Sequence, residues 1–156
     1  MHLIGCSMHN QDKWDKRYLD MAKLIATWSK DPSTKCGAVI VNKHNEIVSV
    51  GFNGFPKGVQ DTTMRLEDRD TKYATTLHAE RNAILFARQP LHDCTIYTFP
   101  MQCCSECAAM AIQSGIKRHV SLAFKPIRWQ KSFNLANQMF YESNVNTQYY
   151  SLTELL

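Results

Sequence analysis

The chain has 156 residues, of which 44% are hydrophobic and 21% are charged, and its net charge is +4. This length and hydrophobic fraction suit one core, so we expect residues 1–156 to form a single domain. The sequence contains neither a signal-peptide-like start nor an apolar run long enough to span a bilayer, so we expect a cytoplasmic protein with reduced cysteines and no membrane partner. Its basic residues are spread along the chain, which gives no support for duplex nucleic acid as a partner but permits a phosphorylated ligand.

The first half of the chain predicts a helix, a hairpin and a loop. Asp12 is a candidate N-cap for a helix that ends near Asp31-Pro32, because a residue before proline avoids helical dihedrals. The strand-like runs 38–41 and 47–50 flank a polar turn and predict a hairpin. Residues 51–73 are polar and contain glycine and proline, which predicts a long functional or mobile loop.

The second half predicts helices alternating with strands. The expected helices cover 78–87, 104–114 and 128–141, and the expected strands cover 95–99, 119–124 and 147–152. This order favours an α/β fold with three α/β/α layers and a central mixed sheet of about five strands. Two of the helices then begin at one edge of the sheet, where α/β proteins commonly place sites.

Those two helix starts carry residues that could share one metal ion, His78-Ala79-Glu80 and Cys104-Ser105-Glu106-Cys107. Two cysteines at i and i+3 lie on one helix face, and a helix start favours thiolate. His78 and Glu80 do not share a face, so Glu80 is better placed as a flanking base than as a ligand. Three nitrogen or sulfur ligands leave the fourth position of zinc for water, whose pKa the metal lowers. This pattern predicts hydrolytic chemistry.

The cysteine pair leaves alternatives open. By itself, a C-x-x-C pair fits a redox motif or half of a structural zinc site equally well, and the upstream His-Ala-Glu shifts the balance towards catalysis. Cys103 with Cys107 is also an allowed ligand spacing. We prefer Cys104 with Cys107, because residues 107–112 resemble a core helix with Gly115 as its stop. Cys103 is then a buried thiol beside the site.

The ordered motifs resemble the zinc-dependent cytidine deaminase-like superfamily, whose signature is H-x-E followed by P-C-x-x-C. The closer similarity is to deoxycytidylate (dCMP) deaminases. It lies in residues 29–41 (SKDPSTKCGAVIV), 51–58 (GFNGFPKG), 70–73 (DTKY), 78–84 (HAERNAI), 104–107 (CSEC) and 113–117 (QSGIK). The chain departs from that pattern in having Cys103 where a proline is usual and Arg81 where an apolar residue is usual. It also lacks the usual tyrosine- and aspartate-containing stretch after Phe124.

The resemblance implies a cytidine deaminase-like fold and the hydrolysis of dCMP, or of a C5-modified dCMP, to dUMP and ammonia. It assigns one zinc ion to His78, Cys104 and Cys107. It assigns to Glu80 the transfer of protons from water to the pyrimidine N3 and to the departing ammonia. The carbonyl of Ala79 is expected near the reacting C4 atom.

The same resemblance implies contacts to the rest of a nucleotide. Asn53 matches a sugar-contacting asparagine, and Ser29 and Lys30 match the neighbourhood of the 5′-phosphate. The 51–58 loop implies a site for a Mg2+-bound nucleoside triphosphate effector. On spacing alone, a turn is the favoured role for Asn53 with Gly54, and Lys30 is more often a solvated surface lysine than a phosphate ligand. We also expect a homo-oligomer.

Two further function classes stay open from sequence. One is another deaminase of the same fold that acts on a nucleoside, a free base or a transfer-RNA adenosine. The other is a non-catalytic, zinc-stabilised binding module, which would need a fourth protein ligand and would give Glu80 no purpose.

Overall fold

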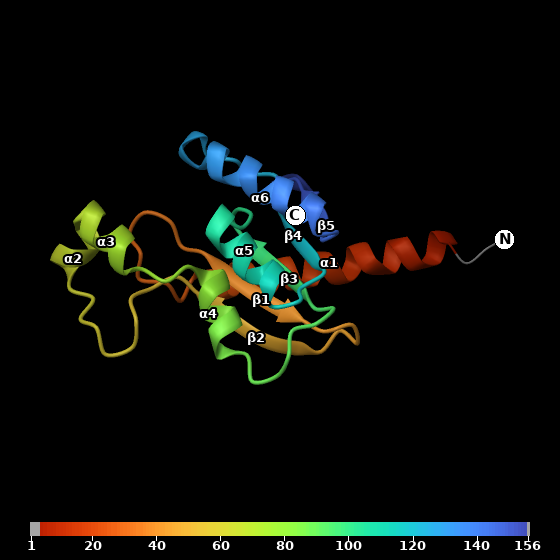
Figure 1. Cartoon of the computed structure of the whole chain (residues 1–156), viewed down its shortest axis with the longest axis horizontal. Coiled ribbons are helices and arrows are strands. Elements are labelled where there is room, and N and C mark those ends of the chain that lie inside the picture. Colours follow the sequence, from red (N-terminus) through yellow and green to blue (C-terminus); the bar gives the residue numbers. More distant parts are fainter. Residues whose placement is uncertain (1–3, 156) are drawn as a thin grey trace.

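The computed structural model describes residues 4–155, with side chains from residue 10 onward. Across these residues, five strands form one mixed sheet with helices on both faces, giving three layers (Figure 1). The strands are β1 (Gly37–Val41), β2 (Ile47–Phe52), β3 (Thr95–Phe99), β4 (Arg118–Leu122) and β5 (Asn146–Tyr150). The helices are α1 (Ile4–Ala26), α2 (Thr63–Glu67), α3 (Arg69–Thr75), α4 (Ala79–Phe86), α5 (Ser105–Gln113), α6 (Gln130–Glu142) and α7 (Leu152–Leu155). None of the helices described has the length and hydrophobicity needed to cross a membrane.

The sheet has the order β2-β1-β3-β4-β5. β1 pairs antiparallel with β2 and with β3, whereas β3, β4 and β5 are parallel to one another. The parallel pairs are joined by crossovers through α5 and α6, as parallel strands require. The predicted hairpin, the mixed sheet and its three-layer arrangement are confirmed.

The interior strand β1 is buried on both faces of the sheet. Val39 and Val41 pack in one core with residues of α1, and Ala38 and Ile40 pack in a second core with residues of α4 and α5. Side chains alternate along a strand, so one short apolar run can serve two cores. This arrangement fixes α1 on one face and the helices α4 and α5 on the other.

Gly51 allows β2 and α4 to approach each other closely. A Cβ atom at this position would lie 2.3 Å from the Ala79 carbonyl oxygen and 2.5 Å from the Ala83 backbone nitrogen. Any other residue would therefore push the first turn of α4 away from the sheet. Because Glu80 lies in that turn, Gly51 sets the position of a predicted catalytic residue.

Helix α1 is held to the sheet by a fully buried carboxylate, that of Asp15. Arg118 of β4 donates two hydrogen bonds of 2.6 Å to it, and the hydroxyls of Tyr97 and Tyr150 each donate one of 2.8 Å. Burial alone would raise the pKa of Asp15, but hydrogen bonds from Arg118, Gln11 and Tyr150 outweigh it and lower the pKa below 3.8. One acid thus ties α1 to three strands.

The structure differs from two predictions of local structure. Helix α1 begins at Ile4 rather than at Asp12, whose carboxylate accepts a hydrogen bond from the Tyr150 hydroxyl at 2.8 Å. Residues 51–73 are not a continuous loop, because the side chains of Thr62 and Asp68 cap the starts of α2 and α3. Such single caps stabilise helices too short to show an apolar period.

Replacing the buried acid should destabilise the fold. We expect Asp15→Ala to lower the free energy of unfolding by about 3–5 kcal/mol, because it leaves the Arg118 guanidinium without its partner. The matching fall in Tm is roughly 6–20 °C, measured by calorimetry. Asp20→Ala, which removes an exposed acid of the same helix, is the control and should change Tm by little.

The difference between wild type and Asp15→Ala should depend on pH. A carboxyl whose pKa is lowered in the folded state stabilises it above the ordinary value of 3.8, and this stabilisation is lost as the pH falls through the folded-state value. The gap in Tm should therefore be constant near neutrality and shrink below about pH 4. A gap that is unchanged at pH 3 would show that the Asp15 charge contributes nothing.

Candidate active site

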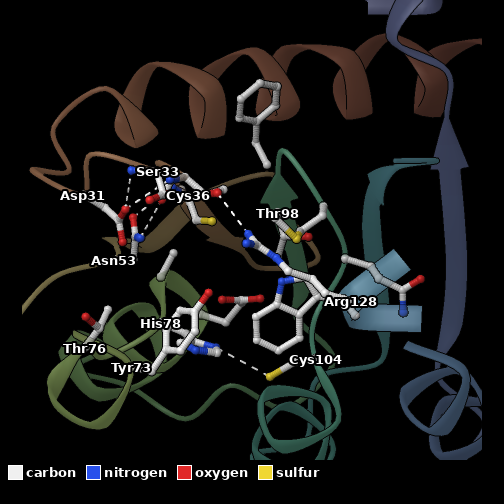
Figure 2. A pocket seen from close by; sticks show the side chains of 18 of the residues that line it. Asp31, Ser33, Cys36, Asn53, Tyr73, Thr76, His78, Thr98, Cys104 and Arg128 are labelled. Carbon is white, nitrogen blue, oxygen red and sulfur yellow. Dashed lines mark hydrogen bonds between the residues drawn. The ribbon is translucent and has the colours of Figure 1, made fainter. Parts of the chain in front are cut away.

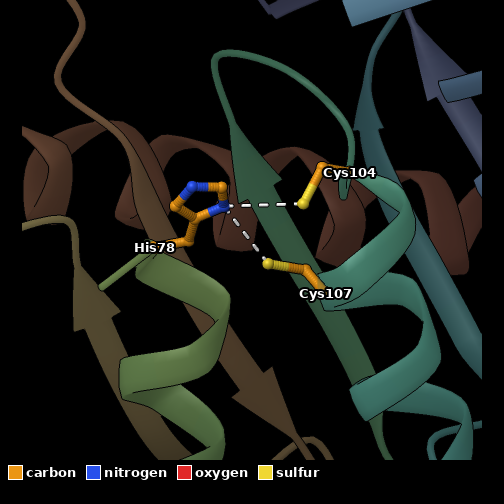
Figure 3. A group of neighbouring side chains, drawn as sticks. All are labelled: His78, Cys104 and Cys107. Carbon is orange, nitrogen blue, oxygen red and sulfur yellow. Dashed lines mark hydrogen bonds between the residues drawn. The ribbon is translucent and has the colours of Figure 1, made fainter. Parts of the chain in front are cut away.

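Two helix starts bring three candidate metal ligands together. His78 is the N-cap residue of α4 and Cys104 that of α5, and Cys107 lies in the first turn of α5. Nδ1 of His78 lies 3.5 Å from Sγ of Cys104 and 3.4 Å from Sγ of Cys107 (Figure 3). Among the residues described, these three form the group that could hold a metal ion, and Cys103 does not belong to it.

The spacing of the ligand atoms fits a tetrahedral zinc site. Zinc lies about 2.0–2.1 Å from histidine nitrogen and about 2.3 Å from cysteine sulfur. At the tetrahedral angle these bonds separate nitrogen from sulfur by about 3.5 Å, which both observed distances match. Three protein ligands leave the fourth position for a small molecule, as in catalytic rather than structural zinc sites.

The electrostatics of the group also suit a metal. A hydrogen bond from Cys107, followed by one from His78, lowers the pKa of Cys104 to about 3 despite burial. The hydrogen bond to Cys104 raises the pKa of His78. These hydrogen bonds favour the thiolate of Cys104, the form in which sulfur ligates zinc, whereas the hydrogen bond to Cys104 raises the pKa of Cys107.

Glu80 lies beside the metal group without joining it. Its side chain is 7% exposed and lines the same cavity as His78 and Cys104. Burial raises the pKa of Glu80, and the Cys103 thiol donates a hydrogen bond to its carboxylate. Burial also raises the pKa of Cys103, which therefore stays protonated and able to donate. Cys103 is thus a buried thiol beside the site, as the sequence predicts.

The cavity around Glu80 is formed by segments distant in the sequence (Figure 2). Asn53 and Ala79, which are predicted to contact the substrate, line it together with Cys36 and Thr98. The side chain of Asn53 accepts a hydrogen bond from the Cys36 backbone N–H at 2.8 Å and donates one to the Thr34 carbonyl at 2.9 Å. Asn53 therefore also holds the cavity wall in place.

The predicted phosphate residues Ser29 and Lys30 are not among the cavity-lining residues. Ser29 is buried, and its hydroxyl donates a hydrogen bond to the Asn53 carbonyl at 2.8 Å. The Lys30 side chain is 72% exposed and pairs with Asp61 at 2.8 Å. Ser29 thus supports the residue that lines the cavity, and Lys30 lies at the surface.

Sequence reasoning gave no catalytic or binding role to Arg128, which also lines the cavity. Arg128 and Trp129, from the 3-10 turn Ile127–Trp129, both line it, and Figure 2 shows the side chain of Arg128. The ring of Trp129 meets His78 edge-on, with ring centroids 6.1 Å apart. The available signal was positional, because this turn follows the carboxyl end of β4 at the sheet edge where α/β proteins bind ligands.

The comparisons with known proteins agree with this geometry. The family model described as "Cytidine and deoxycytidylate deaminase zinc-binding region" matches residues 12–123. An uncharacterized deaminase of Aliivibrio fischeri is 45% identical over 149 residues, covering 90% of this chain and 95% of the relative. A probable deoxycytidylate deaminase of Caenorhabditis elegans is 48% identical over 112 residues, covering 68% and 55%. The deoxycytidylate deaminase of Mus musculus is 40% identical over 121 residues, covering 72% and 66%, so this chain spans two thirds or less of the animal relatives.

Solved structures show the same fold at low sequence identity. A dCMP deaminase from the cyanophage S-TIM5 superposes with a TM-score of 0.68 at 20% identity, covering 88% of this chain and 98% of that one. A structure from a study of tRNA:A34 deaminases superposes with a TM-score of 0.52 at 19% identity, covering 88% and 94%. The family model spans all three metal ligands, Glu80 and the sheet that positions them. The chain belongs to the cytidine and deoxycytidylate deaminase family and is a zinc-dependent deaminase.

Proposed function

We propose that this enzyme hydrolyses dCMP, or a C5-modified dCMP, to the corresponding deoxyuridylate and ammonia. The proposal rests on the family match, which includes the metal group and Glu80. Relatives that are 40–48% identical are named deoxycytidylate deaminase or probable deoxycytidylate deaminase. A cytoplasmic location, a homo-oligomeric state and the triphosphate effector site at residues 51–58 stay predictions.

Each part of the chemistry has a residue suited to it. His78, Cys104 and Cys107 would hold the zinc, which would supply the Lewis acidity that makes water nucleophilic near neutral pH. The Glu80 carboxylate is placed to accept a proton from the attacking water and to deliver protons to N3 of the base and to the departing amine. In the overall reaction, water adds at C4 and ammonia leaves from it.

The environment of Glu80 favours this proton transfer. The Cys103 thiol holds its carboxylate, and the surrounding cavity wall is largely apolar, with Phe99, Trp129 and Phe133 among its residues. Burial limits the contact of the Glu80 carboxylate with bulk water, which favours proton exchange with a bound substrate.

The ligand assignment predicts which cysteine substitutions remove the metal. One zinc should bind per chain, and Cys104→Ser or Cys107→Ser should lose it, measured by elemental analysis of the purified protein. Cys103→Ala is the matched control and should retain most of the zinc, because its thiol contacts Glu80 and lies outside the ligand group. Loss of zinc from Cys103→Ala but not from Cys104→Ser would reverse the assignment.

Substitution of Glu80 should separate catalysis from structure. Glu80→Ala should keep zinc and fold while kcat falls by about two or more orders of magnitude, the scale of general acid–base catalysis. Glu142→Ala, at an exposed position of α6, should leave kcat nearly unchanged. Activity of Glu80→Ala within tenfold of wild type would remove Glu80 from the mechanism.

The substrate proposal is tested by measuring ammonia release from dCMP, deoxycytidine, cytosine and an adenosine-containing RNA. We expect kcat/KM for dCMP to exceed that for deoxycytidine by at least about a hundredfold, since two charge-assisted hydrogen bonds to the phosphate suffice for that ratio. The preference should weaken at high salt. Equal turnover of dCMP and deoxycytidine would favour a nucleoside deaminase instead.

A further inference from the structure

Arg128 lies at the opening of the active-site cavity without an acidic partner. Its side chain extends across the cavity in Figure 2, and its Nη2 atom donates a hydrogen bond to Thr34 Oγ1 at 3.3 Å. None of the ion pairs among the described side chains includes Arg128. A guanidinium has five N–H donors, so most of its donors are free for a ligand.

The other charges at this opening satisfy one another. The buried Lys72 donates hydrogen bonds to Asp31 Oδ1 at 3.2 Å and to Ser33 Oγ at 3.1 Å. The same oxygen of Asp31 accepts from the backbone N–H groups of Ser33 and Thr34, at 2.8 and 3.1 Å. This pair organises the cavity rim, and among the residues that line the cavity it leaves Arg128 as the basic side chain without an acidic partner.

A second pocket adjoins the cavity, and basic side chains outnumber acidic ones in its lining. Both are lined by Ser33, Lys72, Tyr73 and Arg128, and the second adds Arg69 and Glu67. The Arg69 guanidinium donates to the Tyr73 hydroxyl at 3.3 Å. That hydrogen bond lowers the pKa of Tyr73 against the opposing effect of burial, and the nearby charges of Arg128, Arg69 and Lys72 lower it further.

We infer that Arg128 binds the 5′-phosphate of the substrate and thereby sets the preference for a nucleotide, an inference that rests on the proposed dCMP deamination. A guanidinium matches a phosphate with two parallel hydrogen bonds, which a lysine cannot form. The neighbouring Trp129 contacts His78, where the base would react. The short turn Ile127–Trp129 therefore carries one residue at the base end of the cavity and one, Arg128, at the phosphate end. With the base at Glu80, the 5′ end of the nucleotide points outwards to Arg128.

Lys30 provides a direct comparison, because the resemblance to the family predicts it near the phosphate. It is mostly exposed, paired with Asp61 and outside the cavity-lining residues, whereas Arg128 is unpaired and lines the cavity. If Lys30 binds the phosphate, its substitution should reduce the preference for dCMP over deoxycytidine more than substitution of Arg128 does. If Arg128 binds the phosphate, the order is reversed.

The test measures kcat/KM for dCMP and for deoxycytidine in wild type, Arg128→Met, Arg128→Lys and Lys30→Met. We expect Arg128→Met to lower the value for dCMP about 10–100-fold, mainly through KM, while the value for deoxycytidine stays within about threefold. Arg128→Lys should fall between, because it keeps the charge and loses the paired hydrogen bonds. Lys30→Met and the surface control Arg88→Met should retain the wild-type ratio.

Zinc content and Tm, measured for every variant, separate misfolding from lost recognition. Inorganic phosphate should inhibit the wild type competitively against dCMP and inhibit Arg128→Met at least about tenfold more weakly. A parallel loss for both substrates, or a larger loss of the ratio in Lys30→Met than in Arg128→Met, would overturn the role of Arg128. A wild type without preference for dCMP would instead overturn the proposed function, and this inference with it.

Discussion

The site depends on the close packing of two helix starts against one face of the sheet. His78 and Cys104 each occupy the N-cap position of a helix, so their side chains project from the helix ends into the same space. The approach of α4 to β2 requires a glycine at position 51, since a Cβ there would collide with the Ala79 carbonyl. That close approach sets the positions of His78 and Glu80 at the start of α4.

The buried network around Asp15 acts on the opposite face of the sheet. Its hydrogen bonds come from β3, β4 and β5, and β3 and β4 lead directly into the segments that carry the cysteines and the 127–129 turn. A sheet restrained from the α1 side provides a rigid base for the catalytic side. The metal group and Glu80 are thus positioned by regular elements, whereas Arg128, to which we assign the phosphate, lies in a connection between two of them.

Local patterns were sufficient to predict much of the fold and the metal group. The hairpin shows an apolar run on each side of a polar turn, and the cysteine pair has helical spacing, so both signals lie within a few residues. The link between Asp15 and Arg118 joins residues far apart in sequence and leaves no such signal. Arg128 was missed for the same reason, because its role comes from its position opposite Thr34 and Asp31 after folding. Helices α2 and α3 depend on single caps rather than on an apolar period.

The 127–129 turn lies beyond the part of the chain matched by the family model, which ends at residue 123. The residues that perform the chemistry and the residue assigned to phosphate therefore belong to separate stretches of the sequence. A connection between a strand and a helix tolerates insertions and substitutions far better than the elements that it joins. Evolution, or a protein engineer who exchanges this connection among homologues, could redirect the enzyme to other pyrimidine derivatives while its metal centre stays untouched.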